Sequence, residues 1–202
     1  AVSDVVINRF EIRGASASLG IDALWSSGEF SENVLEDNEW AVYVLYPPTD
    51  VVISENTFAE NDHAIHLNQC DSATYGAVTI QNNLLLGEET VGSLGGVGVY
   101  SDTSNPEIFN NTLVKLRQGL YFDGAATLSP VPVNNIITLS GVGMRSTAAA
   151  YIDPNFFRYN DVRALARNYI NIPDLTGING NISVNPRFIS FTDDSDFSND
   201  NF

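Results

Sequence analysis

The stretch that decides the fold is Val51–Cys70, with the sequence VVISENTFAENDHAIHLNQC. It predicts a strand that ends at a corner marked by Asn56, then a second short strand, a polar bend and a third strand. The corner pattern, an Asn followed two places later by an apolar residue, returns along the chain at spacings of 23 to 28 residues. A repeat of this length built from strands predicts a solenoid, in which each unit buries its apolar face by stacking on its neighbours. The Asn residues expected to share one corner are Asn8, Asn33, Asn56, Asn83, Asn111, Asn135 and Asn160.

A second marker follows each corner, where a small residue opens an alternating run of apolar and other residues. The small residues are Gly20, Ala41, Ala64, Gly96, Gly119 and Gly141. Alternation with a period of two places neighbouring side chains on opposite faces of a strand. The pairs expected inside the solenoid are Ile21/Ala23, Val42/Val44, Ile65/Leu67, Val97/Val99, Leu120/Phe122 and Val142/Met144.

Two other repeat classes do not fit. Leucine-rich repeats need a different spacing between their Asn and the alternating run, and helical repeats do not alternate with a period of two. The pattern resembles the right-handed parallel β-helix proteins of the pectate-lyase-like superfamily, through its I-x-x-N-x-F segments and its Asn column. Gly180–Phe188, GNISVNPRF, is similar to a segment that closes such domains, with Asn185 where Asp is usual. The resemblance covers roughly residues 5–190. It implies an all-β, single-domain right-handed parallel β-helix of about seven or eight turns.

The domain organisation follows from the extent of the repeat. We expect one β-helix domain over residues 1–190 and an acidic, poorly ordered tail over 191–202. Asp194 and Asp196 hint at a calcium loop, but the Gly and Glu of the EF-hand pattern are missing. Residues 156–170 predict a last regular turn followed by a short helical or irregular segment. Because the repeat is already present at Val5, we expect a longer parent chain or end-to-end stacking on another molecule.

Composition restricts the partners. With 25 acidic and 9 basic residues among 202, the net charge of −16 argues against binding to nucleic-acid phosphates. No run of 18 apolar residues is present, so membrane insertion is not expected. Cys70 is the single cysteine and cannot form an internal disulfide. The resemblance implies an extracellular or cell-surface location.

The outward positions of the third strands are the candidate binding surface. Turns stack about 4.8 Å apart, close to the length of one sugar residue, and tyrosine offers an apolar ring with a polar tip. Gly98 and Gly143 are expected to hollow this surface, and the alternative is an ordinary solvent-exposed face. The residues expected to bind a polysaccharide are Tyr43, His66, Asn68, Tyr100, Tyr121, Asp123 and Arg145.

The expected function is therefore a structural or carbohydrate-contacting surface module. The alternative is a polysaccharide lyase, epimerase or glycoside hydrolase in which His66, Asp123 and Arg145 act as catalytic residues. The motifs of the polygalacturonase-type, pectate-lyase and alginate-epimerase enzymes of this fold class are absent, which favours the first reading. No cofactor is expected, although calcium is compatible with the acidic surface. No metal site is expected either, because His63 and His66, three residues apart, should point to different sides of a strand.

Overall fold

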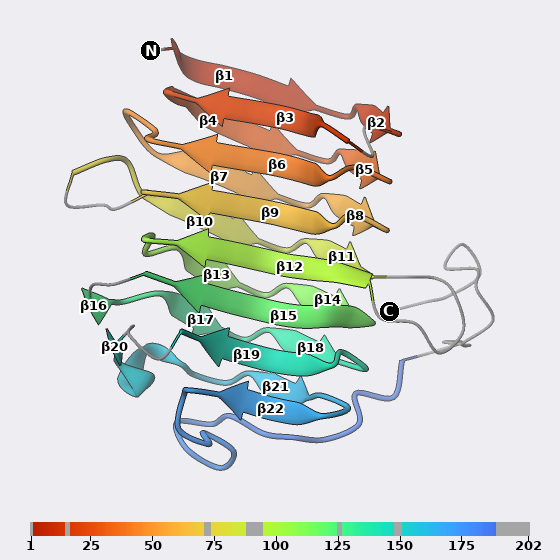
Figure 1. Ribbon diagram of the computed structural model, residues 1–202, viewed down its shortest axis with the longest axis vertical. Coiled ribbons are helices and arrows are strands. Elements are labelled where there is room, and N and C mark those ends of the chain that lie inside the picture. Colours follow the sequence, from red (N-terminus) through yellow and green to blue (C-terminus); the bar gives the residue numbers. More distant parts are fainter. Residues whose placement is uncertain are drawn as a thin grey trace.

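The structure is a computed structural model that describes residues 2–14, 17–70, 74–87, 95–124, 127–147 and 151–188. In this part of the chain all strands run parallel to strands one turn earlier or later, and they form three long sheets (Figure 1). The chain follows a right-handed coil from the N-terminal end in Figure 1, as expected from the right-handed rule for parallel crossovers. The predicted parallel β-helix is confirmed.

Each turn contributes one strand to each sheet. Sheet A has six strands, while sheets B and C have seven each, so the solenoid has about six full turns, slightly fewer than expected. Sheet A contains β1 (Val2–Asn8), β4 (Ser26–Ser31), β7 (Val51–Ser54), β10 (Val78–Gln81), β13 (Glu107–Phe109) and β17 (Val131–Val133). Sheet B contains β2 (Glu11–Arg13), β5 (Val34–Glu36), β8 (Thr57–Ala59), β11 (Leu84–Leu86), β14 (Thr112–Val114), β18 (Ile136–Thr138) and β21 (Asp161–Arg163). Sheet C contains β3 (Leu19–Leu24), β6 (Trp40–Leu45), β9 (His63–Asn68), β12 (Gly95–Asp102), β15 (Leu116–Asp123), β19 (Val142–Ser146) and β22 (Arg167–Ile170).

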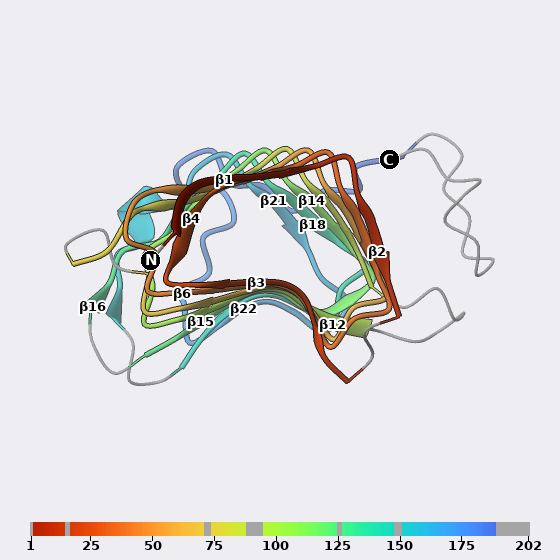
Figure 2. The ribbon, with the colours of Figure 1, turned by 90° about the horizontal axis from the view of Figure 1, so that it is seen from above.

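Viewed along the coil, the three sheets enclose a single interior (Figure 2). The described parts of the connections from sheet C to sheet A leave the same edge of sheet C (Figure 2). Among their described residues are the short pair β16 (Thr127–Leu128) and β20 (Tyr151–Ile152), and the 3-10 helix η1 (Pro154–Phe156). The expected tail at 191–202, with Asp194 and Asp196, lies outside the described residues.

The corner between sheets A and B holds a continuous ladder of Asn side chains. Within it, each Nδ2 donates to Oδ1 of the Asn one turn later, at 3.0 Å in every step, and that oxygen also accepts a backbone N–H. Six of the seven predicted members are confirmed, but Asn8 is not a member, because it aligns with Ser31. Phe10 takes the equivalent place in the first turn, where its N–H donates to Asn33. The ladder consists of Asn33, Asn56, Asn83, Asn111, Asn135, Asn160 and Asn181.

The left-handed residue of this corner is the one before each ladder Asn, and not the Asn itself. The residues that precede the first six ladder members have φ between 55° and 59°, and Gly180, which precedes Asn181, has φ of 77°. The Asn side chains therefore serve the corner through hydrogen bonds. All seven Asn side chains are almost fully buried. Because their amides are hydrogen-bonded, they add no unpaired polar group to the interior. The non-glycine residues before the ladder are Glu32, Glu55, Asn82, Asn110, Asn134 and Tyr159.

The interior is filled by stacked apolar columns. The predicted inward residues Ile65, Leu67, Leu120 and Phe122 have no exposed surface. In the same way, Ile21, Ala23, Val42, Val44, Val97, Val99 and Met144 are buried as expected. Val142 is the exception and is only partly buried.

The register of sheet C explains this exception. Val99 pairs with Ile65 and Leu120, and Leu120 pairs with Met144, so β12 and β19 are displaced by two residues from the predicted alignment. The small-residue column is therefore Gly20, Ala41, Ala64, Gly98, Gly119 and Gly143. Its members stay small because an added Cβ on Gly98 would lie 2.6 Å from the Gly119 carbonyl oxygen of the next turn. Gly98 and Gly143 are buried inside the coil. The prediction that they hollow the outer face is therefore wrong.

The C-terminal turns are more regular than expected. Residues 156–170 form the end of η1, then β21 and β22, with no described helix beyond η1. β21 continues sheet B and β22 continues sheet C. The Asn168 side chain accepts a hydrogen bond from the Ala164 N–H and stabilises the turn between these two strands. The apolar residues of this segment are spaced as in a helix, which is why the sequence did not predict the second strand.

Candidate functional site

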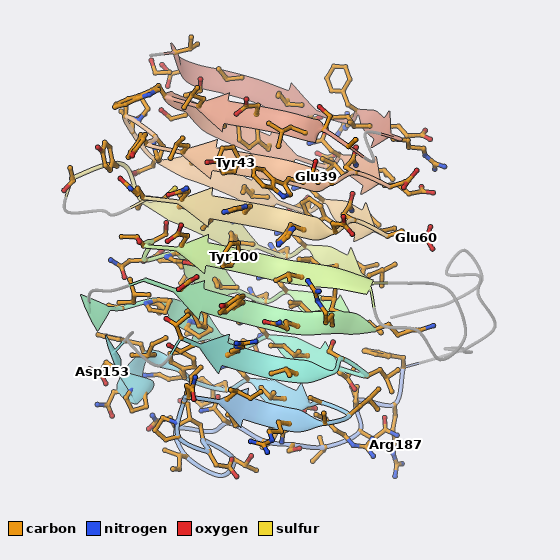
Figure 3. The ribbon with its side chains drawn as sticks, in the orientation of Figure 1. Glu39, Tyr43, Glu60, Tyr100, Asp153 and Arg187 are labelled. Atoms are coloured by element: carbon orange, nitrogen blue, oxygen red, sulfur yellow. The ribbon has the colours of Figure 1, made fainter. Side chains whose placement is uncertain are left out.

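The outer face of sheet C gathers the predicted binding residues. One outward column contains Tyr43, His66, Tyr100, Tyr121 and Arg145, on five successive strands from β6 to β19. We call these residues the aromatic column. Tyr43 and Tyr100 project from the front of this sheet in Figure 3. The inward pairs predicted from the sequence would align Tyr100 and Arg145 with Asp123 and not with Tyr121, an error that follows from the two-residue displacement of β12 and β19.

The members of the aromatic column pack on one another. Ring centroids lie 5.0 Å apart for Tyr43 and His66, 4.6 Å for His66 and Tyr100, and 5.0 Å for Tyr100 and Tyr121. The Arg145 guanidinium lies over the Tyr121 ring, 4.9 Å from its centroid. Tyr100 and Tyr121 are stacked at 29°, so each covers one face of the other, whereas Tyr43 meets His66 edge-on at 77°. The column is therefore a self-packed row and not a flat aromatic surface.

A second outward column lies beside it and is polar. It contains Asn68, Asp102 and Asp123 on β9, β12 and β15, and we call it the polar column. The Tyr100 hydroxyl donates to Asp123 Oδ2 at 2.9 Å, and Asn68 Nδ2 donates to the Tyr43 hydroxyl at 3.4 Å. Asp102 was missed by the sequence prediction, because the displaced register of β12 had put Tyr100 in its place. The two columns together form a partly exposed band with carboxylates along one side.

Burial and neighbouring carboxylates alter the pKa values of this band. Burial, followed by the hydrogen bond to Asp123, raises the pKa of Tyr100. Burial also raises the pKa of Tyr43, with Asp22 and Asp102 adding to the effect. Both hydroxyls are therefore neutral at physiological pH and can act as hydrogen-bond donors as well as acceptors.

His63 and His66 lie side by side, contrary to the prediction. Ala64 and Ile65 between them are both buried in the core, which leaves both histidines on the outer face. Their ring centroids are 5.8 Å apart and their planes are inclined by 34°. Trp40 covers His66, with 4.7 Å between the two ring centroids.

The two imidazoles are held in their neutral form. Burial lowers the pKa of His66 to about 4, with a further contribution from His63. Burial and the charge of Arg117 lower the pKa of His63. Both ring nitrogens of His66 and Nδ1 of His63 are buried without a hydrogen-bond partner among the described residues.

The three candidate catalytic residues are not brought together. His66 lies on β9 and Arg145 on β19, with β12 and β15 between them. Three strand spacings of about 4.8 Å separate them by roughly 14 Å. His66 is also only 8% exposed, beneath Trp40 and its tyrosine neighbours. Asp123 and Arg145 lie on the neighbouring strands β15 and β19, and no ion pair joins them among the described residues.

A separate aromatic group stands near the N-terminal turns. Trp25, 47% exposed, packs on Tyr46 with a centroid distance of 4.9 Å, and Tyr75 joins both rings. Trp25 therefore lies at the surface and is partly covered by these two rings. The pairing could have been anticipated, because Trp25 and Tyr46 directly follow the paired residues Leu24 and Leu45.

Charge is distributed unevenly along the solenoid. Residues 1–114 contain 17 acidic and two basic residues, a net charge of −15. Residues 115–188 contain four acidic and seven basic residues, a net charge of +3, and the remaining four acids follow position 188. The C-terminal end of the aromatic column, at Arg145, therefore belongs to the basic part of the chain.

In the part of the chain that the structure describes, no group of three or more His, Cys, Asp or Glu side chains is arranged to hold a metal ion. No described helix is long and apolar enough to cross a membrane. No curated protein and no solved structure matches the sequence. The family described as periplasmic copper-binding protein (NosD) matches residues 2–182, which is nearly the whole chain. The chain therefore belongs to the NosD family.

Proposed function

We propose that this chain is an extracytoplasmic β-helix module that contacts an oligosaccharide with the outer face of sheet C. The observation that supports this function is the pair of parallel columns, aromatic and polar, on successive strands. A glycan lying along the solenoid would meet a similar pair of side chains about every 4.8 Å. The family name includes the word periplasmic, which supports a location outside the cytoplasm.

The mode of contact follows from the packing of the rings. Because Tyr100 and Tyr121 cover each other's faces, a sugar would meet mainly ring edges and hydroxyl groups. The carboxylates of Asp102 and Asp123 can accept hydrogen bonds from sugar hydroxyls, and the amide of Asn68 can both donate and accept. Each sugar would contribute little, so affinity should grow with the length of the oligosaccharide.

The position of an acidic glycan follows from the uneven charge. At physiological ionic strength charges are screened over about 8 Å, whereas seven strands span roughly 30 Å. A bound glycan therefore experiences the charge of the nearby turns rather than the total of −16. An acidic sugar should lie at the C-terminal end of the column, near Arg145, and a neutral glycan is not restricted in this way.

Binding to a panel of neutral and acidic oligosaccharides, with and without calcium, tests the proposal. We expect affinity to rise with oligosaccharide length and to fall at least about tenfold in Tyr121→Ala, in line with the loss of a central aromatic anchor. Arg145→Gln should weaken only the acidic ligands. Isothermal titration and product analysis by mass spectrometry give the readout.

Tyr159→Ala is the matched control, because Tyr159 is 65% exposed and lies at the corner between sheets A and B. Its binding should equal that of the wild type. Equal binding by Tyr121→Ala, or no binding on the whole panel, would show that the face is ordinary surface. Unsaturated or shortened products would show that the chain cleaves or modifies the glycan, which is the lyase, epimerase or hydrolase alternative.

We also propose copper binding as a second function, because the family name includes it and a specific feature of this chain favours it. That feature is the pair of neighbouring imidazoles, whose buried nitrogens have no hydrogen-bond partner in the described part of the chain. Imidazole nitrogen is a common ligand of copper. Metal analysis of the chelator-treated protein after exposure to copper under reducing conditions should find about one bound ion per chain.

A further inference from the structure

The imidazoles of His63 and His66 form a small site whose polar atoms are unsatisfied. His66 is 8% exposed, and neither of its ring nitrogens has a hydrogen-bond partner among the described residues. A buried nitrogen without a partner costs free energy, so such an atom in a native protein calls for a missing partner. Nδ1 of His63 is in the same condition. The two rings together thus carry three buried nitrogens without a hydrogen-bond partner among the described residues.

The surroundings decide which group fits. His66 is surrounded by the rings of Trp40, Tyr43 and Tyr100 at centroid distances of 4.7, 5.0 and 4.6 Å. An ordered buried water needs two to four polar partners, and here these would be the imidazole nitrogens themselves. A cation is better matched, because nitrogen lone pairs can coordinate it and the faces of Trp and Tyr attract positive charge.

We propose that His63 and His66 bind a single copper(I) ion on the outer face of sheet C. This inference rests on the copper function proposed above and identifies its ligands and its oxidation state. Copper(I) is a closed-shell, monovalent ion that accepts two nitrogen ligands, which is the number this site supplies. Zinc usually takes four ligands and copper(II) a tetragonal set of N and O ligands. No described cluster of three or more ligating side chains is present to supply them.

Size and charge agree with this choice. Two metal–nitrogen bonds of about 2.0 Å, with the ring radii added, put the centroids of two facing imidazoles roughly 6 Å apart. The observed separation is 5.8 Å, so only a small movement of the rings would be needed. A monovalent ion is also less costly than a divalent one to transfer from water into apolar surroundings, because the desolvation penalty rises with charge.

A competition titration with a chromophoric copper(I) chelator tests the site directly. The experiment uses the whole chain in the variant Trp25→Phe, which leaves Trp40 as the one tryptophan beside the site. We expect one copper(I) per chain and quenching of Trp40 fluorescence with the same midpoint. His66→Gln and His63→Gln should each weaken binding by more than about 100-fold, beyond the 10–100-fold typical of a lost outer-shell partner. Zinc should not compete at equal concentration.

Asp22→Asn and a thermal unfolding curve of each variant serve as controls. Asp22→Asn removes an exposed carboxylate from the same sheet, two strands away from His66, and should bind copper(I) as the wild type does. His63→Gln is the safer variant for folding, because His63 is only partly buried. If both histidine variants fold and bind copper(I) unchanged, this site is overturned while the copper function stands. If the wild type takes no copper(I) from the chelator, both are overturned.

Discussion

Replacing Asn83 with alanine is expected to lower the free energy of unfolding by about 3–5 kcal/mol, because several buried groups lose their partners at once. Asn83 Oδ1 accepts the backbone N–H and the side-chain Nδ2 of Asn56, at 2.9 and 3.0 Å. Its own Nδ2 donates to the Ile53 carbonyl and to Asn111. Urea unfolding followed by circular dichroism measures the loss. Because solenoids unfold by units, we expect the transition to broaden as well as to shift, and both changes are read from the same curve.

Asn8→Ala is the matched control for the ladder. Asn8 is also an Asn near this corner, but it lies outside the ladder. Its Nδ2 donates to Ser31 Oγ and Glu32 Oε1 at a partly exposed edge. Its replacement should cost less than about 1 kcal/mol, as for a surface substitution. If Asn8→Ala and Asn83→Ala lowered the free energy of unfolding equally, the hydrogen bonds of the ladder would not be what stabilises the fold at Asn83.

Leu120→Ala is expected to destabilise the protein by about 2–5 kcal/mol, as found for other large-to-small changes in a core. Leu120 has no exposed surface and stacks between Val99 and Met144 on the neighbouring strands. The lost methyl groups leave a cavity that rigid neighbouring turns cannot close. Thermal and urea unfolding measure the change.

The same substitution at Leu165 provides the comparison, because that side chain is 64% exposed. Leu165→Ala should change the free energy of unfolding by no more than about 0.5 kcal/mol. A loss below this value for Leu120→Ala would mean that the inward and outward faces of β15 had been exchanged.

The architecture was predictable because two independent periodic signals agree in the sequence. The register was harder, since two glycines two residues apart compete for the small-residue position in both turns. Gly96 and Gly98 both lie in β12, whereas Gly141 directly precedes β19 and Gly143 lies within it. Either glycine satisfies the small-residue pattern, and only the pairing between strands selects the second. Asn8 was misplaced for a similar reason, because Phe10 imitates the apolar residue that follows each ladder Asn.

The sequence named the residues of the aromatic and polar columns except Asp102, but not how they are arranged on the sheet. The aromatic column depended on the corrected register, which brings Tyr100 and Arg145 beside Tyr121. The histidine pair could not be derived from strict alternation, because two consecutive inward residues, Ala64 and Ile65, interrupt it. A small residue followed by an apolar one recurs at this place in each turn and was the available signal.

The Asn ladder also gives the solenoid a polarity. In every step the side-chain oxygen faces the preceding turn and the NH2 group of the first six members faces the following turn. Parallel amide dipoles reinforce one another, as peptide dipoles do in an α-helix. The ladder is thus a polarised filament with its negative end toward Phe10 and its positive end toward Asn181. A further turn can join such a filament in one orientation only, because a reversed turn would oppose oxygen to oxygen or NH2 to NH2.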